Sequence, residues 1–478
     1  MAKPNVWFVM MDQLRWDALG CYGNEIVETT NLDYIASRGT VFENCYTPTP
    51  TCLPARSTLL TGKDPWKVGI MYTDPANLGI IDLGETLPKV LSDHGYHTQC
   101  VGCMGVPPLR MLRGFHDVRL YTLNDQVDSE YKRWFDANKP ADCGPYEHGL
   151  GPNSWMSRLW HLPEYLHPVA WTAQESIRFL QRRDPTRPFF LKTSFLRPHA
   201  PYDPPQYYFD LYNDKDLPEP VVGNGWDEIH DVPATDPDAW HGRLKPEKAH
   251  RAKAGYYGLI HFIDHQIGVI RQYLSKHKLL DNTIIVFTSD HGDMMGDHHL
   301  WRKSYPYEGS SHIPLLVSLP PAMQQNLQSR SKAPVCLQDI MPTILDACGV
   351  AIPEEVDGKS TLPLISGAST TTRDYVHGEH RQCYVPENEH HFLTDGNWKY
   401  IWFTQTNQEQ FFDLNADPNE QRDLAMLPEY NAKKQHWREC LIAELQPRQT
   451  GLVENGELVC QKDKPAPISP HYRIVDMA

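Results

Sequence analysis

Apolar runs that end in polar residues recur along the chain. One covers residues 4–11 and leads into Asp12 and Gln13, a second covers 188–195, and a third covers 283–288. Continuous apolar runs of this length are typical of strands that are buried on both faces of a parallel sheet. Ligand-binding side chains gather at the carboxyl ends of such strands in open α/β sheets. The pattern therefore predicts a buried, mostly parallel sheet with a polar site along one edge.

Helices are predicted between these strands. Residues 253–275 carry apolar side chains at helical spacing, which indicates one buried helical face. The same reasoning predicts helices over 30–38, 85–93, 171–182 and 335–348, the last with a kink at Pro342, and strands over 41–46 and from residue 95. Residues 105–165 are expected to form loops over the polar site, and residues 203–245 are expected to make a long surface excursion.

The character of the sequence changes from about Thr371. Residues 392–403 and 410–414 predict antiparallel strands, and residues 428–445 predict a helix. We therefore expect an α/β fold with two parts: a larger domain over residues 1–370, with a central mixed, mostly parallel sheet flanked by helices, and a smaller C-terminal α+β subdomain over residues 371–478.

Composition narrows the possible functions. The 478 residues are 40% apolar, which is enough for a sizeable core, and the net charge of −15 argues against nucleic-acid binding. The apolar run from Val6 to Met11 is too short for a signal-peptide core or a membrane span. Eleven cysteines include one close pair, Cys100 and Cys103, and no pattern of a small disulfide scaffold. These features predict a reduced, cytoplasmic protein that does not bind membranes.

One stretch, residues 51–62, combines a loop, a helix start and a helix stop. Prolines at 48 and 50 lead into it, Pro54 suits the first turn of a helix, and Gly62 suits its end. Cys52 would then lie where free backbone N–H groups bind anions and activate thiols. Arg56, one turn later, could share an anionic ligand with it. The alternative for a cysteine taken alone is a buried structural thiol.

The full stretch resembles the signature of the type I sulfatases, Cys-x-Pro-Ser/Ala-Arg-x-x-x-Leu-Thr-Gly, in which the cysteine is oxidised to formylglycine. Every fixed position is present: Cys52, Pro54, Ala55, Arg56, Leu60, Thr61 and Gly62. Similarity continues through residues 397–400, 412–414 and 417–420, so it spans nearly the whole chain. The resemblance implies an alkaline-phosphatase-like fold, hydrolysis of a sulfate ester, and a formylglycine-generating maturase as a partner.

Two polar pairs follow apolar strands, Asp12-Gln13 and Asp290-His291. Each pair taken alone could simply cap a turn. Together, carboxylate, amide and imidazole groups suit a divalent cation such as calcium, manganese or magnesium. The pairs resemble the metal ligands of the family, which implies a metal held by both pairs and by residue 52, with Ca²⁺ the first expectation. Gln13 and His291 match the pattern of phosphonate monoester hydrolases and some sulfatases.

Two further residues gain roles from the resemblance. His199 lies in a Pro-His-Ala-Pro-Tyr stretch and would face the leaving oxygen of the ester; the alternative is a histidine fixed in a proline-rich turn. Lys303 would grip the sulfate group; the alternative is a solvated lysine. No role is assigned to the nearby His298, His299 and Arg302, and the histidines at 377, 380, 390 and 391 are expected to be solvated surface residues.

One departure from the family pattern matters. Sulfatases commonly have Gly-Lys-x-His after the strand that begins Gly-Tyr-x-Thr, whereas this chain has Gly102-Cys103-Met104-Gly105. Phosphonate monoester hydrolases also lack that lysine and histidine. The leading hypothesis is therefore a sulfuric ester hydrolase acting on a small-molecule or carbohydrate sulfate ester. A phosphonate monoester or phosphate diester hydrolase is the alternative. A non-catalytic binder of sulfated glycans is a third reading, which the intact Cys52 disfavours.

Overall fold

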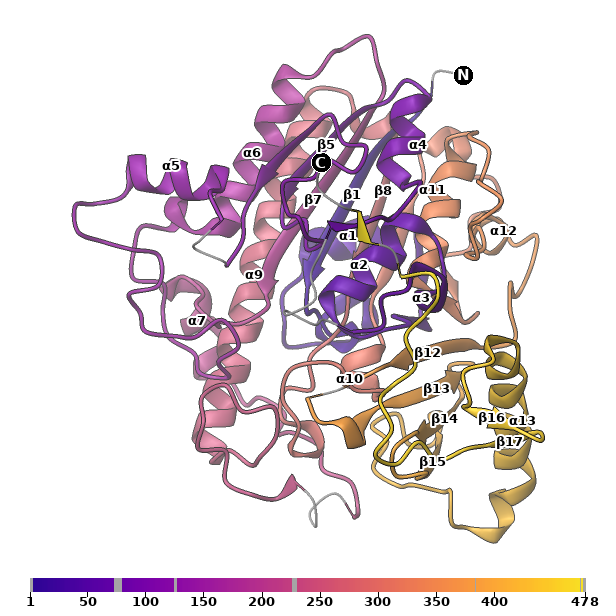
Figure 1. Ribbon diagram of the computed structural model, residues 1–478. Coiled ribbons are helices and arrows are strands. Elements are labelled where there is room, and N and C mark those ends of the chain that lie inside the picture. Colours follow the sequence, from indigo (N-terminus) through magenta and orange to yellow (C-terminus); the bar gives the residue numbers. More distant parts are fainter. Residues whose placement is uncertain are drawn as a thin grey trace.

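A mixed sheet forms the centre of the computed structural model, which describes residues 3–72, 80–123, 127–225, 230–382, 384–472 and 474–475 (Figure 1). Within these ranges the sheet has eight strands. In spatial order they are β10 (Arg330–Ser331), β2 (Thr40–Phe42), β9 (Leu315–Ser318), β8 (Thr283–Ser289), β1 (Asn5–Asp12), β7 (Phe189–Pro198), β5 (His97–Gly102) and β6 (Asp117–Leu120). Only β9 runs antiparallel to its neighbours, so the predicted mixed, mostly parallel sheet is confirmed.

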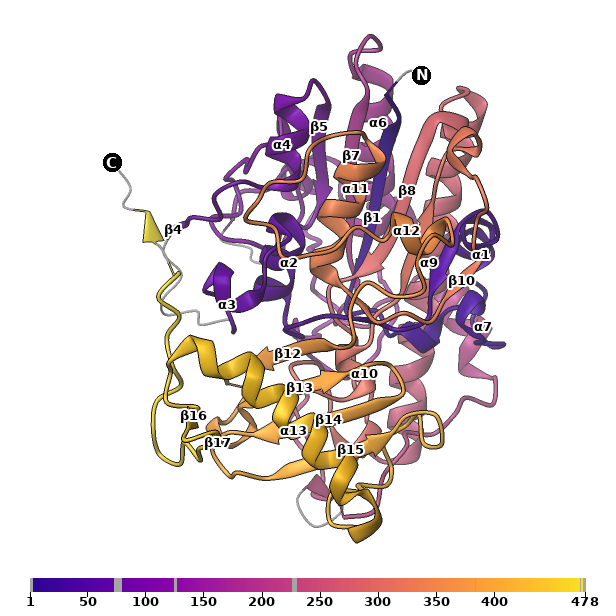
Figure 2. The same cartoon turned by 90° about the vertical axis from the view of Figure 1, so that its right-hand side faces the viewer.

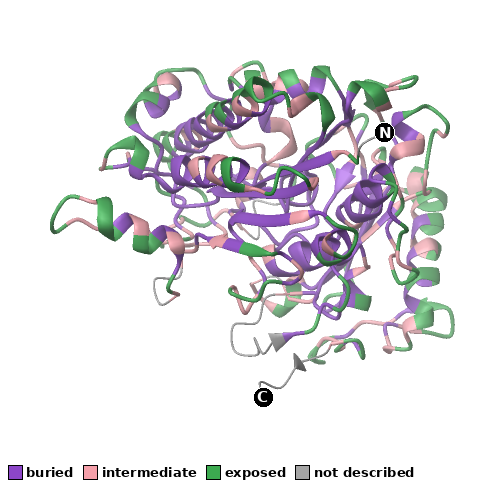
Figure 3. Ribbon diagram, turned by 90° about the horizontal axis from the view of Figure 1, so that it is seen from above, coloured by how far each residue is buried: buried purple, intermediate pink, exposed green. Residues whose placement is uncertain are grey.

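Helices cover both faces of this sheet (Figures 1 and 2). Alternate residues of β1 point to opposite faces, because successive side chains of a strand alternate: Trp7, Val9 and Met11 join one buried cluster, and Val6, Phe8 and Met10 join the other. The first cluster includes α1 (Thr30–Ser37), α6 (Pro168–Arg182), α7 (Gln206–Asn213) and α9 (Pro246–Lys276), and the second includes α2 (Cys52–Thr61), α4 (Leu87–Asp93), α11 (Ile340–Ala347) and α12 (Leu362–Ile365). Figure 3 shows the strands buried and the outer helical surfaces exposed.

The C-terminal part forms a separate antiparallel sheet below the central one (Figure 1). Its strands are β12 (Val376–His380), β13 (His390–Thr394), β14 (Trp398–Phe403) and β15 (Glu409–Asp413), and α13 (Asn431–Leu445) packs against them. This confirms the predicted C-terminal α+β subdomain, while the boundary after residue 370 stays a prediction.

Shorter elements complete the described chain. They are α3 (Pro65–Val68), α5 (Glu130–Asn138), α10 (Glu308–Ser311), and the strand pairs β3 (Cys45–Tyr46) with β11 (Val335–Cys336), β16 (Val453–Glu454) with β17 (Glu457–Leu458), and β4 (Ile80–Ile81) with β18 (Ile474–Val475). The cysteines in the described ranges are free. No helix in these ranges combines the length and apolar composition that crossing a membrane requires.

Two element predictions were wrong in their boundaries. The strand predicted over residues 41–46 is divided, because β2 pairs with β9 whereas β3 pairs with β11 in another sheet. The helix predicted over residues 335–348 begins only at Ile340. Pro342 therefore lies in its first turn and not in the middle of a helix, and a missing N–H there breaks no helical hydrogen bond, so the reason for predicting a kink does not apply.

Three predictions about surface segments also need correction. Residues 105–165 contain β6 at the sheet edge and α5, and residues 203–245 contain α7, which packs on α9. The four histidines expected at the surface lie on β12 and β13, where those at 380, 390 and 391 are buried and the one at 377 is half-buried. Because these residues are polar, the sequence pattern did not predict strand β12. This strand pairs with β13, and the pairing stacks the rings of His377 and His391.

Candidate active site

Cys52 is the first residue of α2, as the sequence predicts. Thr51 before it is extended, Pro54 lies in the first turn, and Gly62 ends the helix in the left-handed conformation with φ 65°. The surrounding polar residues at 12, 13, 56, 290 and 291 are each at most 2% exposed, whereas Cys52 is partly exposed. Cys52 is therefore more accessible than these five residues.

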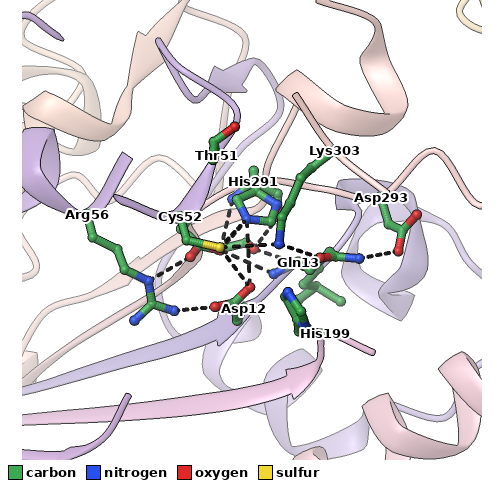
Figure 4. Close-up of polar contacts among 12 residues, drawn as sticks. Asp12, Gln13, Thr51, Cys52, Arg56, His199, His291, Asp293 and Lys303 are labelled. Atoms are coloured by element: carbon green, nitrogen blue, oxygen red, sulfur yellow. Dashed lines mark hydrogen bonds and ion pairs between the residues drawn. The ribbon is translucent and has the colours of Figure 1, made fainter. Parts of the chain in front are cut away.

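Adjacent strands deliver the predicted metal ligands to one place. Asp12 ends β1, and Asp290 and His291 follow the neighbouring strand β8. Ligand atoms of Asp12, Cys52, Asp290 and His291 all lie within 4.8 Å of one another (Figure 4). His291 Nε2 lies 3.1 Å from Cys52 Sγ and 3.7 Å from an oxygen of each aspartate. His291 Nδ1 hydrogen-bonds the Gly292 carbonyl oxygen at 2.9 Å, which leaves the Nε2 lone pair directed into the cluster.

Crowding of these groups shifts their protonation. Burial and the neighbouring Asp290 carboxylate raise the pKa of Asp12 to about 6. Burial opposes ionisation of Asp290 as well, but the adjacent His291 ring and the charges of Arg56 and Lys303 outweigh it and lower the pKa of Asp290. Burial lowers the pKa of His291 to about 3. Two close carboxylates and a neutral imidazole are the donor set that a divalent cation would stabilise, so these residues fit the implied metal.

Gln13 reaches the same cluster through its amide oxygen. Lys303 Nζ donates to Gln13 Oε1 at 2.9 Å, and Gln13 Nε2 donates to Asp293 Oδ2 at 2.5 Å. Asp293 thereby holds the amide so that its oxygen faces the site, as Figure 4 shows. We did not predict a role for Asp293, although it lies in the same Ser-Asp-His-Gly-Asp segment as two predicted ligands.

Arg56 contacts the carboxylates directly. Its Nε donates to Asp290 Oδ2 at 2.8 Å and its Nη2 donates to Asp12 Oδ2 at 2.7 Å, while Nη1 donates to the Cys103 carbonyl oxygen at 3.0 Å. The side chain is fully buried. This geometry favours a role in orienting the two carboxylates, and it differs from the expected sharing of an anionic ligand with Cys52.

Lys303 and His199 lie on opposite sides of Gln13 in Figure 4. Lys303 Nζ donates to Cys52 Sγ at 3.3 Å. Burial alone would lower the pKa of Lys303, but Cys52, Asp12 and Asp290 outweigh it and raise it, so the amine stays charged. Burial and the charge of Lys303 lower the pKa of His199 well below its usual range. The ring is therefore neutral here, whereas the sequence reasoning assumed an ordinary pKa for proton donation.

The positions where the family has lysine and histidine are filled differently. Cys103 is 8% exposed, and its backbone oxygen accepts from both Arg56 and Lys192 Nζ, the latter at 3.3 Å. Gly105 has φ 73°, and a Cβ there would lie 2.2 Å from Arg56 Cδ. A histidine at 105 would therefore collide with Arg56 as it is placed here.

Comparisons with known proteins agree with this geometry. The chain matches the family described as "Sulfatase" over residues 4–350 and the one described as "N-sulphoglucosamine sulphohydrolase, C-terminal" over residues 296–446. It is 42% identical to a protein named arylsulfatase from Clostridium perfringens, with 98% of this chain and 100% of that protein covered. It is 26% identical to an N-acetylglucosamine-6-O-sulfatase from Bacteroides thetaiotaomicron, covering 93% and 86%.

A solved structure supports the fold. The phosphonate monoester hydrolase of Agrobacterium radiobacter superposes with a TM-score of 0.79 at 24% identity, covering 93% of this chain and 96% of that one. At this identity the likeness concerns the fold alone. With residues 4–350 matched and nearly the full length aligned at 42% identity, the chain belongs to the sulfatase family.

Proposed function

We propose that this enzyme hydrolyses an organic sulfate monoester, with residue 52 as the nucleophile after its oxidation to formylglycine by a maturase. The observation that carries the proposal is the placement of Cys52. It is partly exposed at the start of α2, within 3.3 Å of the charged Lys303 amine and next to a buried cluster of carboxylates and imidazole. The names of the two relatives support a small-molecule or carbohydrate sulfate ester as the substrate.

The metal and the modified residue would supply the chemistry that side chains cannot. A divalent cation held by Asp12, Gln13, Asp290, His291 and residue 52 would lower the pKa of a nucleophilic hydroxyl and offset negative charge, with Ca²⁺ our first expectation and Mn²⁺ or Mg²⁺ the alternatives. As a formylglycine hydrate, residue 52 would supply two hydroxyls, one to attack sulfur and one to release sulfate afterwards.

The surrounding side chains would bind and orient. Lys303 attracts a sulfate oxygen to the position beside residue 52, because its ammonium is buried and charged. Arg56 holds the two carboxylates through the hydrogen bonds described above. His199 Nδ1 hydrogen-bonds the Ala200 carbonyl oxygen at 2.8 Å, so Nε2 is the ring atom available to the leaving oxygen. An anionic ester bound beside this ring would raise its pKa and favour the protonated donor.

Phosphonate monoester or phosphate diester hydrolysis is the second candidate. Gln13 and His291 both lie at the site, and Cys103 and Gly105 replace the positively charged pair that many sulfatases carry. The resemblance noted above is that phosphonate monoester hydrolases also lack this pair, which is the support for the second candidate. The ratio of kcat/KM for 4-nitrophenyl sulfate to that for a 4-nitrophenyl phosphonate monoester separates the two candidates, and a ratio below one would favour the second.

The first test is the mass of tryptic peptide 39–56, on protein produced in its native host or with a co-expressed maturase. Conversion of the Cys52 thiol to an aldehyde exchanges sulfur for oxygen and removes two hydrogens, so we expect a loss close to the mass of one water molecule. Cys45 in the same peptide is an unmodified reference.

Cys52→Ala should abolish turnover of sulfate esters with thermal unfolding unchanged. Retained turnover in that variant would refute the mechanism.

A further inference from the structure

The hydroxyl of Thr51 does not cap the helix that follows it, although its position would allow this. Thr51 is the N-cap residue of α2, and a threonine there usually accepts a hydrogen bond from the first turn of its helix. Here the side chain makes no such bond. Instead, Thr51 Oγ1 lies 2.6 Å from His380 Nε2 and 2.7 Å from Ser304 Oγ. The residue before the nucleophile is therefore tied to two distant segments.

Both segments matter to the site. Ser304 follows Lys303, the residue whose amine contacts Cys52, and the Ser304 amide donates to the Pro50 carbonyl oxygen at 2.8 Å. The residues on either side of Lys303 have left-handed backbones, with φ 67° at Arg302 and φ 78° at Ser304. Such conformations are strained for residues other than glycine and persist where neighbouring contacts hold them. The contacts that Ser304 makes to residues 50 and 51 supply that support.

His380 comes from the C-terminal subdomain and is placed by sheet pairing. It ends β12, where its partner on β13 is His390. The adjacent Glu379 amide donates to the Pro48 carbonyl oxygen at 2.8 Å, so two consecutive residues of β12 contact the loop that precedes Cys52. His380 is 2% exposed. Burial and the neighbouring His390 keep the imidazole neutral by lowering its pKa, and a neutral ring can accept the Thr51 proton at one nitrogen.

We infer that His380 is a positioning residue of the active site, through which the C-terminal subdomain sets the placement of Cys52 and Lys303. It acts through Thr51, whose hydroxyl it contacts, and the same hydroxyl contacts Ser304. The chain His380–Thr51–Ser304 thereby fixes the two residues that flank the reacting groups. This inference deepens the proposed function and rests on it for its kinetic part, whereas its geometric part stands without it.

The test compares variants that keep shape but change hydrogen bonding. His380→Phe keeps a ring and removes the bond to Thr51, Thr51→Val removes the hydroxyl, and His380→Gln can restore a donor and acceptor near the original Nε2. We expect His380→Phe and Thr51→Val each to lower kcat by about ten- to a hundredfold, with a much smaller change in KM, because misplacement of reacting groups by less than 1 Å has effects of this size. His380→Gln should recover most of the loss.

A double variant and a matched control distinguish a positioning role of His380 from a general loss of structure. The double variant should be no slower than either single variant, because both changes break one chain of contacts. His377→Phe is the control: its ring also lies on β12 but three residues away and on the opposite face, where it contacts His391. If His380→Phe is as active as His377→Phe, or if the losses of the two single variants multiply, the inference is wrong.

A readout that does not need turnover completes the test. Hydrogen exchange by mass spectrometry should show faster exchange in peptides that cover residues 300–306 and 48–56 in His380→Phe, because the loop that holds Pro50, whose carbonyl oxygen accepts from the Ser304 amide, loses its contact with His380. Unchanged exchange in both peptides would overturn the inference whatever the kinetics. If the wild-type protein hydrolyses neither sulfate nor phosphonate esters, the proposed function fails, and the exchange result still decides whether His380 holds this loop.

Discussion

At the scale of single residues, each polar side chain of the site has a neighbour that decides which of its atoms faces residue 52. The Gly292 carbonyl oxygen forms a hydrogen bond with His291 Nδ1, and Asp293 accepts a hydrogen bond from the amide nitrogen of Gln13. Neighbours of this kind raise ligand basicity and fix orientation. The sequence identified His291 and Gln13 because each belongs to a pair of polar residues that directly follows an apolar strand. It did not identify Asp293, since a carboxylate after a predicted ligand has several ordinary uses.

Asp293→Ala should weaken metal binding without removing a ligand. The Gln13 amide would lose the acceptor that orients it, and we expect the affinity for Ca²⁺ to fall by about ten- to a hundredfold. Isothermal titration of the metal-free protein measures this without reference to turnover.

The matched control is Asp231→Ala. It removes a carboxylate that is not part of the site and whose oxygen lies 3.1 Å from Arg243 Nε. It should leave the calcium affinity unchanged. Equal affinities for the Asp293→Ala variant and the wild-type protein would show that Asp293 does not orient Gln13.

At the scale of elements, α2 is the helix on which the site depends, and its end was as predictable as its start. Gly62 terminates it with φ 65°, and a Cβ at that position would lie 2.9 Å from Val356 Cγ1 and 3.2 Å from Met341 Cβ. The predicted stop at glycine thus has two causes, the left-handed backbone and close packing. Only the first could be read from the sequence, because Val356 and Met341 lie far along the chain.

Gly62→Ala should therefore destabilise the protein twice over. The left-handed backbone costs about 1–2 kcal/mol for a residue with a Cβ, and overpacking adds about 1–3 kcal/mol. Gly95→Ala isolates the first effect, because Gly95 has φ 91° and no atom would lie within 4 Å of its Cβ. Urea unfolding measures both variants, and equal losses would mean that the packing around Gly62 adjusts at no cost.

Glu389, immediately before β13, predicts a dependence of stability on pH. Burial raises its pKa to about 7, and its carboxyl group accepts a hydrogen bond from Thr404 at 2.6 Å. Because the folded pKa lies above the unfolded value, the contribution is fully present below about pH 4.3 and is lost as the pH rises through 7.

The wild-type protein should thus lose about 1 kcal/mol of stability from this group between pH 6 and pH 8. Glu389→Gln should lack that part of the dependence. Parallel pH profiles for the two proteins in thermal unfolding would contradict the assignment.

At the scale of the whole molecule, a buried ion cluster joins the C-terminal sheet to the catalytic part. Lys399 Nζ on β14 lies 2.6 Å from a Glu308 oxygen on α10 and 3.0 Å from a Glu420 oxygen, and it also donates to the Pro306 carbonyl oxygen at 2.9 Å. All three charged side chains are buried. Glu308 lies five residues after Lys303, so this cluster anchors the segment that carries Lys303.

Lys399→Met should destabilise the protein by about 3–5 kcal/mol, because it leaves the buried Glu420 without its cationic partner and leaves Glu308 with His312 alone of its two ion-pair partners described here. Lys433→Met is the control on the same subdomain: that amine lies 3.5 Å from the centre of the Trp398 ring, and its loss should cost about 0.5–1 kcal/mol. Thermal unfolding measures both. A small effect of Lys399→Met would show that the cluster does not hold the two parts together.

The sequence by itself determined which strands end in pairs of polar residues and where α2 starts. Continuous apolar runs, prolines and glycines act locally. Their pattern was therefore enough to place residues 12, 290 and 291 at the ends of strands and residue 52 at the start of a helix without coordinates. Tertiary structure decided the rest. The order β8-β1-β7 brings segments nearly 300 residues apart to one edge, and partners such as Asp293 for Gln13, the two carboxylates for Arg56, and His380 for Thr51 arise only from that packing. A hydrogen bond between residues 51 and 380 leaves no periodic or motif signal in either segment, because each partner is chosen by the fold and not by its neighbours in the chain.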